Sequence, residues 1–153
     1  MSAQNPVADF QGSLPTLPCT CANLRRAARA VTRLYNGQLR SDDIEITQFT
    51  LLMALDQTGE IPQGKLGKLL ALDSTTLTRV LALLKKRGWI QEKEGEDRRI
   101  RLVRLTSAGR AKLQHSAPHW KRAQARMQGA LGEDTMRQLT GVLAQVTAMA
   151  ADP

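Results

Sequence analysis

The sequence predicts a mainly α-helical protein with one small two-stranded β-hairpin. Apolar residues recur at helical spacing over most of the chain, whereas strict alternation of apolar and polar residues is confined to segments 89–93 and 100–105. Only 3% of the residues are aromatic although 42% are hydrophobic, so Leu, Val, Ile, Ala and Met must fill the core. A chain of 153 residues can bury such a core without disulfides or bound metals.

Two helices are expected in the first part of the chain, after a flexible arm. Residues 1–18 contain three prolines and no periodicity, which is typical of an extended or flexible segment. The first helix begins at Thr20 and ends before the segment SDDIEI. The second covers TQFTLLMALDQTG, with Thr47 as its N-cap and Gly59 as its end.

Two further helices are expected before the hairpin. The third, QGKLGKLLAL, follows Pro62, a residue type that is common at helix starts. The fourth, STTLTRVLALLKKRG, is capped by Asp73 or Ser74 and ended by Gly88. Its apolar stripe consists of Leu77, Val80, Leu81 and Leu84.

The hairpin and two more helices complete the predicted fold. The acidic, glycine-containing segment EGEDR separates the two alternating segments and forms the turn. Thr106 caps a long helix that reaches about Leu131, and Pro118 is expected to kink it. A final amphipathic helix covers residues 133–150.

The positive charge of the chain is concentrated in one central segment. The formal net charge is +8, and residues 65–112 contain 13 basic and 5 acidic residues, which account for all of it. A surface that served only solubility would mix both signs, so this concentration is typical of a module that binds a polyanion. No apolar run is long enough to span a membrane and no secretory signal is evident, so a cytoplasmic protein is expected.

Two short helices joined by the tight link ALDS and followed by a basic hairpin are typical of a winged helix-turn-helix. The second helix fits the major groove of DNA, where short hydroxyl side chains and arginine can contact base edges and phosphates. Arginines of the wing would reach the backbone or the minor groove, and Asp97 could pair with one of them to shape the loop. The candidate DNA-binding residues are Lys65, Lys68, Ser74, Thr75, Thr76, Thr78, Arg79, Asp97, Arg98, Arg99 and Arg101.

The segment LTRVLALLKKRGWIQEKEGEDRRIRLVRLTSAG resembles the core of the MarR family of bacterial regulators. The wing pattern D-x-R-x-x-x-V-x-L-T-x-x-G of that family is matched at every position. The matching residues are Asp97, Arg99, Val103, Leu105, Thr106 and Gly109. The similarity extends over roughly residues 20–150, because TQFTLLMAL and PHWKRAQ also resemble family segments in their proper order.

The resemblance implies a homodimer that binds double-stranded DNA at a palindromic operator, most simply as a repressor. Together with the flexible arm that composition predicts over residues 1–18, it gives a dimerisation helix and link over 19–46, the winged module over 47–109 and dimerisation helices over 110–153. The last helix independently offers a broad apolar face that needs cover. That face consists of Met136, Leu139, Val142, Leu143, Val146 and Met149, and the core of a monomer is its alternative interpretation.

The resemblance also implies a small aromatic or phenolic ligand between the dimer region and the DNA-binding module. The residues that could line such a site are Arg29, Tyr35, Met53 and Trp120, each of which could instead be core or surface. No cofactor, metal or catalytic residue is expected.

Three other interpretations remain open. Cys19 and Cys21 lie at the start of the first helix, where a thiolate could sense peroxide, but two small residues near a flexible terminus are the simpler interpretation. His115 and His119 have the i, i+4 spacing of zinc ligands in an enzyme, but Pro118 between them disturbs the helix. A basic scaffold that binds DNA or RNA without reading sequence would have the same charge but no reason for an uncharged threonine face.

Overall fold

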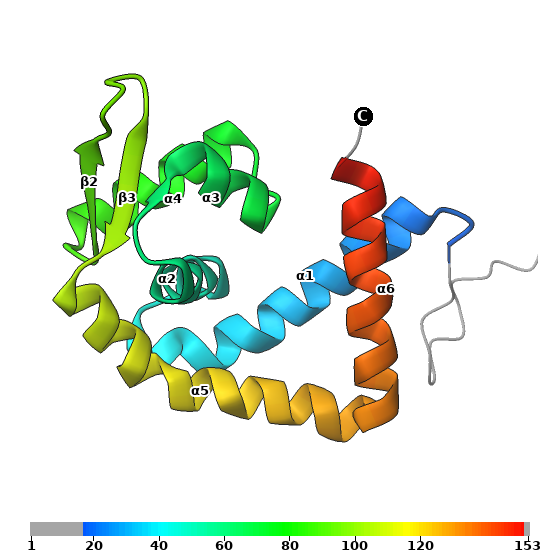
Figure 1. The fold of residues 1–153 in the computed structure, drawn as a ribbon. Helices are drawn as coiled ribbons and strands as arrows, with labels where there is room; N and C mark the ends of the chain where they lie inside the picture. The colour runs from blue at the N-terminus through cyan, green and yellow to red at the C-terminus, as the bar shows by residue number, and fades with distance from the viewer. Residues whose placement is uncertain (1–16, 152–153) are drawn as a thin grey trace, which may run out of the picture. The chain divides into compact units, whose positions relative to one another are not determined.

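The computed structural model describes residues 17–151, and the predicted arm lies outside the described residues except for Leu17 and Pro18. The chain divides between Arg33 and Leu34 into two compact units. Six helices account for most of the described residues, so the prediction of a mainly helical protein is confirmed (Figure 1). They are α1 (Thr20–Leu39), α2 (Ile46–Thr58), α3 (Gln63–Leu70), α4 (Ser74–Lys86), α5 (Ser107–Leu131) and α6 (Glu133–Ala151), with a 3-10 turn η1 (Arg40–Asp42) after α1.

The sheet has three strands instead of the two that were predicted. The hairpin forms from β2 (Ile90–Glu94) and β3 (Arg101–Leu105), in which Ile90 faces Leu105 and Glu94 faces Arg101. A third strand, β1 (Ile61–Pro62), pairs antiparallel with the other edge of β3. Two residues are too few to show an alternating pattern, so the sequence carries no sign of β1.

Helix ends follow the predicted signals in most cases. Gly59 ends α2 with a φ of 71° and donates its N–H to the Leu55 carbonyl. Asp73 caps α4, and Thr106 caps α5 by accepting the Gly109 N–H at 3.0 Å. The helix α5 runs through Pro118 without interruption.

The predicted start of α2 is wrong. Its N-cap is Glu45 and not Thr47, and the side chain of Gln48 accepts the Glu45 N–H at 3.3 Å. The next free N–H, that of Ile46, donates to Asn36 Oδ1 at 2.7 Å. Because Gln48 and Asn36 satisfy these first donors, the helix begins one residue before Thr47.

The core lies between α2, α3, α4, the sheet and α5. Phe49 and Leu52 of α2 are almost fully buried, and the ring of Phe49 stacks on Trp120 of α5 with centroids 5.9 Å apart. The predicted stripe on α4 faces this core, since Leu77, Leu81 and Leu84 are all buried. Because this stripe is buried, the opposite face of α4 is exposed to solvent.

A buried carboxylate joins η1 to α5. The side chain of Asp42 is 2% exposed, and its Oδ2 lies 2.5 Å from His119 Nδ1. His115 Nε2 is 3.5 Å from Asp42 Oδ1 and its side chain is 69% exposed. The two histidines of the predicted zinc-ligand spacing therefore both contact one aspartate, and only His119 makes a short contact.

His119→Ala is expected to destabilise the fold by about 1–3 kcal/mol, because it leaves a buried carboxylate without its closest partner. His115→Ala is the matched control and should change the free energy of unfolding by less than about 0.5 kcal/mol. Urea unfolding followed by circular dichroism measures both. If His119→Ala also changed the free energy of unfolding by less than about 0.5 kcal/mol, the contact of Asp42 with His119 would not stabilise the protein.

Candidate DNA-binding surface

The helices α3 and α4 form a compact pair with a very short connection. Ala71 adopts left-handed backbone angles (φ 49°) directly after α3, and the chain enters α4 at Ser74. Gly67 of α3 allows the two helices to pack closely, because it has no side chain. A Cβ atom at this position would lie only 3.0 Å from Leu77 Cδ2 of α4. Lys65 and Lys68 are exposed on the outer surface of α3.

The outer face of α4 carries polar residues at helical spacing. Thr75, Thr78, Arg79 and Lys86 are all exposed, whereas the buried leucines lie on the opposite face. The sequence prediction did not include Lys86 among the candidate DNA-binding residues. Counting the helical period from Thr75 through Arg79 would have placed Lys86 on this face.

Two of the predicted base-contacting hydroxyls are engaged within α4. Thr76 donates its hydroxyl to Asp73 Oδ2 at 2.6 Å and its N–H to Oδ1 at 2.8 Å, and its side chain is half-buried. The hydroxyl of Thr78 donates to the Ser74 carbonyl at 2.7 Å. Thr76 therefore caps α4 together with Asp73, and its contact with bases stays a prediction. Among the candidate hydroxyls of α4, those of Ser74 and Thr75 have no hydrogen bond to the described residues.

The cap also affects the acidity of Asp73. The Thr76 hydroxyl, followed by the Thr76 N–H, holds the pKa of Asp73 below its usual value. Because the pKa of Asp73 is lower in the folded state, the ionised cap stabilises α4 at pH values above the normal pKa of an aspartate carboxyl. That stabilisation is lost as the pH falls through the lowered pKa.

The tip of the wing is shaped by backbone hydrogen bonds. Asp97 Oδ1 accepts the backbone N–H of Arg99 at 2.9 Å, and the Asp97 carbonyl accepts the N–H of Ile100 at 2.8 Å. Gly95 closes the loop by donating its N–H to the Ile100 carbonyl at 2.8 Å. Asp97 therefore shapes the loop as predicted, but through the Arg99 backbone and not through a guanidinium group.

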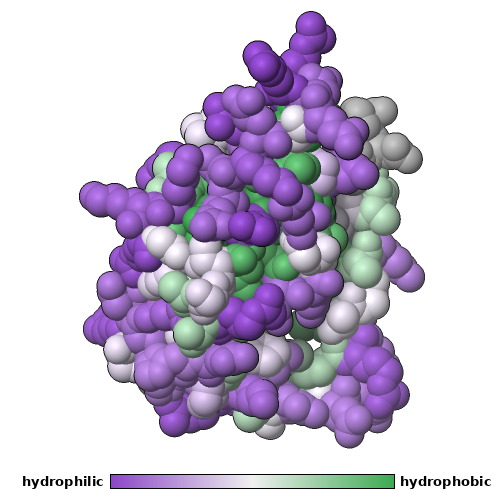
Figure 2. Space-filling model, turned by 60° about the vertical axis from the view of Figure 1, so that its left-hand side comes forward, coloured by the Kyte–Doolittle hydropathy of each residue, from purple (hydrophilic) through white to green (hydrophobic). Residues whose placement is uncertain are grey.

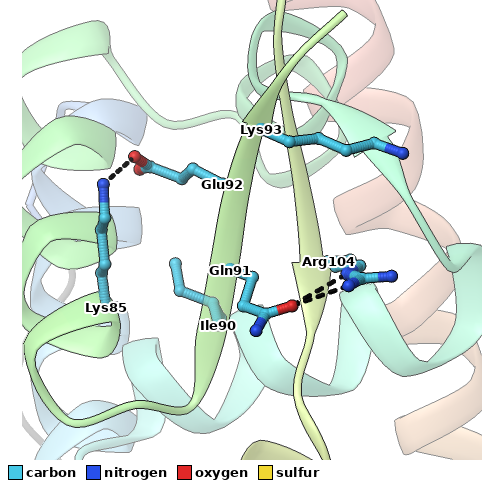
Figure 3. Close-up of a pocket in the computed structure, with 6 residues that line it drawn as sticks. All are labelled: Lys85, Ile90, Gln91, Glu92, Lys93 and Arg104. Atoms are coloured by element: carbon cyan, nitrogen blue, oxygen red, sulfur yellow. Dashed lines mark hydrogen bonds and ion pairs between the residues drawn. The ribbon is translucent and has the colours of Figure 1, made fainter.

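Basic residues on the rest of the wing are engaged with neighbours. Lys85 Nζ lies 2.7 Å from Glu92 Oε2, and the guanidinium of Arg104 donates two hydrogen bonds to Gln91 Oε1, at 3.1 and 2.8 Å (Figure 3). These residues line a cavity of about 270 Å³ together with Lys93, which pairs with Glu60 at 2.8 Å. The two lysine charges are therefore paired with carboxylates, and the Arg104 side chain is held against the wing by an uncharged amide.

A second set of basic side chains has no hydrogen bond or ion pair among the described residues. All of its members are exposed, and all but Lys86 were predicted from the sequence. They are Lys65, Lys68, Arg79, Lys86, Arg98, Arg99 and Arg101. We call them the unpaired basic set. They come from α3, α4 and the wing, and Figure 2 shows that the side of the molecule that carries the wing is mostly hydrophilic.

A groove connects these three elements. Its volume is about 710 Å³, and Lys65 and Lys68 of α3 line it together with Arg99 and Arg101 of the wing. Ser74 stands at the start of α4, and the apolar residues Leu77 and Ile100 also contribute to the lining. Four positive charges around one groove produce a strong local attraction for anions.

The predicted ligand-binding residues lie elsewhere. The Tyr35 hydroxyl donates to Gln124 Oε1, and burial raises the pKa of Tyr35 above its usual value. Met53 and Trp120 are half-buried and pack against the core. Arg29 is exposed and belongs to the unit that ends at Arg33, so the ligand site stays a prediction.

The remaining predictions concern cysteines, metals and membranes. Cys19 and Cys21 are exposed free thiols at the start of α1. Within residues 17–151, no cluster of three or more His, Cys, Asp or Glu side chains is arranged to hold a metal ion. A search of the same residues finds no helix that is both long and apolar enough to cross a membrane.

A short helix pair followed by a β wing, with an exposed polar helix face and an unpaired basic set, defines a winged helix-turn-helix protein. Residues 44–100 match the model of the MarR family. The chain is similar to a probable transcriptional regulator from Pseudomonas aeruginosa, at 31% identity and a TM-score of 0.76, over 84% of this chain and 97% of that one. The chain belongs to the MarR family.

Two further relatives carry informative names. The regulator MosR of M. tuberculosis, whose structure contains DNA, is 31% identical with a TM-score of 0.77 over 88% of this chain and 99% of that one. The uncharacterized transcriptional regulator YwoH of Bacillus subtilis is 30% identical over 91 residues, 60% of this chain and 66% of that protein. The chain spans between 61% and 66% of the first curated relatives it matches. These relatives are named as regulators and not as enzymes, in line with the prediction that the chain has no catalytic role.

Proposed function

We propose that the protein is a homodimeric transcriptional regulator that binds a specific sequence of double-stranded DNA. The observation that carries this proposal is the unpaired basic set, whose members lie on α3, on the exposed face of α4 and on the wing. Basic residues on other faces of the same module are paired with carboxylates or amides. DNA phosphates are the natural partners for the charges that remain.

The relatives support the same partner. MosR is 31% identical over nearly its whole length, and its structure is a complex with DNA. A chain that shares this fold and carries an outward-facing basic set can place α4 in the major groove, with the wing against the backbone or the adjacent minor groove. The repressor role and the small aromatic ligand depend on the family resemblance alone and stay predictions.

Sequence reading is assigned to the N-terminal half of α4. The hydroxyls of Ser74 and Thr75 form no hydrogen bond within residues 17–151, and Arg79 follows Thr75 by one helical turn. Hydroxyls can donate to or accept from base edges, and arginine forms a bidentate pair with guanine. A binder that used charge alone would have no need of this uncharged part of the surface.

Thr75→Ala is expected to weaken operator binding by about 1–3 kcal/mol while leaving the affinity for random duplex nearly unchanged. The control is Thr78→Ala, because the Thr78 hydroxyl already donates to the Ser74 carbonyl. Fluorescence anisotropy with operator and random duplex measures both variants. An equal loss on the two duplexes for Thr75→Ala would remove the base-reading role of this residue.

Dimerisation is inferred from α6. None of its side chains from Glu133 to Ala150 is buried, and its apolar face includes Val142, Leu143 and Met149 at 53%, 42% and 74% exposure. A second copy of the chain is the occupant that the two half-sites of a palindromic operator require. Sedimentation should therefore show a dimer at low micromolar concentration, and a stable monomer of 16.8 kDa with or without operator DNA would contradict the proposal.

The proposed function is tested by selecting DNA fragments with the purified protein and sequencing them. A regulator of this kind should enrich a palindromic sequence with two half-sites, and should then prefer that duplex over random duplex and RNA. A scaffold without sequence preference would enrich no common motif and would bind all three nucleic acids with similar affinity.

A further inference from the structure

The C-terminal end of α4 is attached to a turn that is distant in the sequence. Arg87, the C-cap of α4, donates from Nη1 to the Asp43 carbonyl at 2.5 Å and lies 3.1 Å from Asp43 Oδ2. Its side chain is only 27% exposed, although it stands next to Lys86 on a basic helix end. A basic residue at this place in a DNA-binding helix would ordinarily be counted as a phosphate contact.

Two residues of α5 contact the turn that contains Asp42 and Asp43. Asp42 binds His119 through its buried carboxylate, and its carbonyl accepts a hydrogen bond from Lys112 Nζ. Asp43 has left-handed backbone angles, with φ 50° and ψ 46°, which direct its carbonyl and carboxylate toward the end of α4. The turn formed by Asp42 and Asp43 therefore connects α4 to α5.

A tryptophan completes the connection. The Arg87 guanidinium carbon lies 4.9 Å from the centre of the Trp89 ring, and Lys112 Nζ lies 5.1 Å from it. Trp89 is the residue before β2, and its carbonyl accepts the Thr106 N–H that precedes α5. Arg87 thus makes contacts that fix both the direction in which α4 ends and the point at which the wing begins.

From these contacts we infer that Arg87 and Asp43 position α4 for operator binding, and that Arg87 does not contact DNA. The inference rests on the proposed function, since it assigns to α4 the reading of bases. Bases are read only when the helix lies at one angle and depth in the groove, whereas phosphate attraction tolerates small shifts. Loss of the Arg87 contact should therefore reduce specific binding more than nonspecific binding.

The test compares Arg87→Ala with Lys86→Ala, which removes an equal charge from the neighbouring member of the unpaired basic set. Arg87→Ala should weaken operator binding roughly tenfold and leave random-duplex binding and the salt dependence unchanged. Lys86→Ala should weaken binding to both duplexes. It should also lower the slope of log K against log salt by about 1.8, for two lost contacts in a dimer. Arg87→Lys should restore only part of the loss, because lysine lacks the planar fork.

Asp43→Asn distinguishes positioning of α4 from an effect of charge, because the two predict opposite changes in operator binding. The substitution removes a negative charge and tolerates left-handed backbone angles, so an effect through charge alone would strengthen binding to both duplexes. A positioning role requires weaker operator binding and a non-additive result when it is combined with Arg87→Ala. Thermal unfolding of each variant identifies any that fail to fold, and Arg87→Lys and Asp43→Asn then carry the test.

The outcomes separate this inference from the proposed function. A parent protein without preference for any duplex would contradict the proposed function itself. A parent that prefers its operator, together with an Arg87→Ala variant that lowers the salt slope as Lys86→Ala does, would overturn the positioning role alone. Stronger binding of Asp43→Asn to both duplexes would overturn it in the same way.

Discussion

Gly109→Ala is expected to lower the free energy of unfolding by about 3 kcal/mol or more and to abolish DNA binding at ordinary protein concentrations. A Cβ atom at this position would lie 2.0 Å from the Trp89 carbonyl oxygen and 2.8 Å from Leu105 Cδ1. Backbone atoms cannot move aside as the end of a flexible side chain can. The first turn of α5 would have to separate from the start of the wing, and the Thr106 cap would be lost with it.

Gly129→Ala is the matched control for this prediction. Gly129 lies in the same helix, and an added Cβ atom would meet nothing within 4 Å. Alanine in a helix interior is more stable than glycine by about 0.5–1 kcal/mol, so this variant should be stabilised. Chemical denaturation of both variants checks the opposite signs, and a mild or absent effect of Gly109→Ala would show that the junction between wing and α5 is looser than the contact distances indicate.

The double variant Arg99→Ala/Arg101→Ala should show the largest change in DNA binding at constant stability. Both residues are exposed, line the groove beside α3 and belong to the unpaired basic set. If each contacts one phosphate per subunit of the proposed dimer, four contacts are lost and the slope of log K against log salt falls by about 3.6. The loss should be similar on operator and random duplex, because phosphates carry no sequence information.

Arg104→Ala is the control for charge on the same strand. The guanidinium of Arg104 is bound to Gln91, on the side of the wing where Lys93 pairs with Glu60. Its removal should leave the salt slope nearly unchanged, because a side chain held within the protein releases no counterions from DNA. Salt titrations of the parent and both variants measure the difference, and equal slopes for Arg104→Ala and the double variant would contradict the division between paired and unpaired basic residues.

Features that depend on local physics could be predicted from the sequence. The caps at Asp73 and Thr106, the end of α2 at Gly59 and the buried stripe of α4 all follow from residue types at fixed spacing. The same reasoning located the hairpin, because its alternation extends over several residues in each strand.

Other features depend on contacts between distant residues, and the sequence could not show them. The pairing of Ile61 with Val103 joins positions 42 residues apart, and the contact of Arg87 with Asp43 joins positions 44 apart. Lys85, Lys86 and Arg87 have the same charge and adjoin one another, but only the fold shows that the first and third are paired while the second is not. The hydrogen bond of Thr76 to Asp73 was not foreseen, because a hydroxyl near a helix start serves equally well for capping and for reading bases.

The pairing of β3 on both edges restricts where the wing can vary in length. Ile61 and Pro62 fix its register on one side and β2 fixes it on the other, so an insertion within either strand would shift side chains to the wrong face. We expect insertions to be tolerated instead in the turn between Glu94 and Arg101, where each added pair of opposed residues would extend the hairpin by about 3.3 Å. Divergence among relatives can therefore adjust how far the wing reaches along a duplex without moving the helices beneath it.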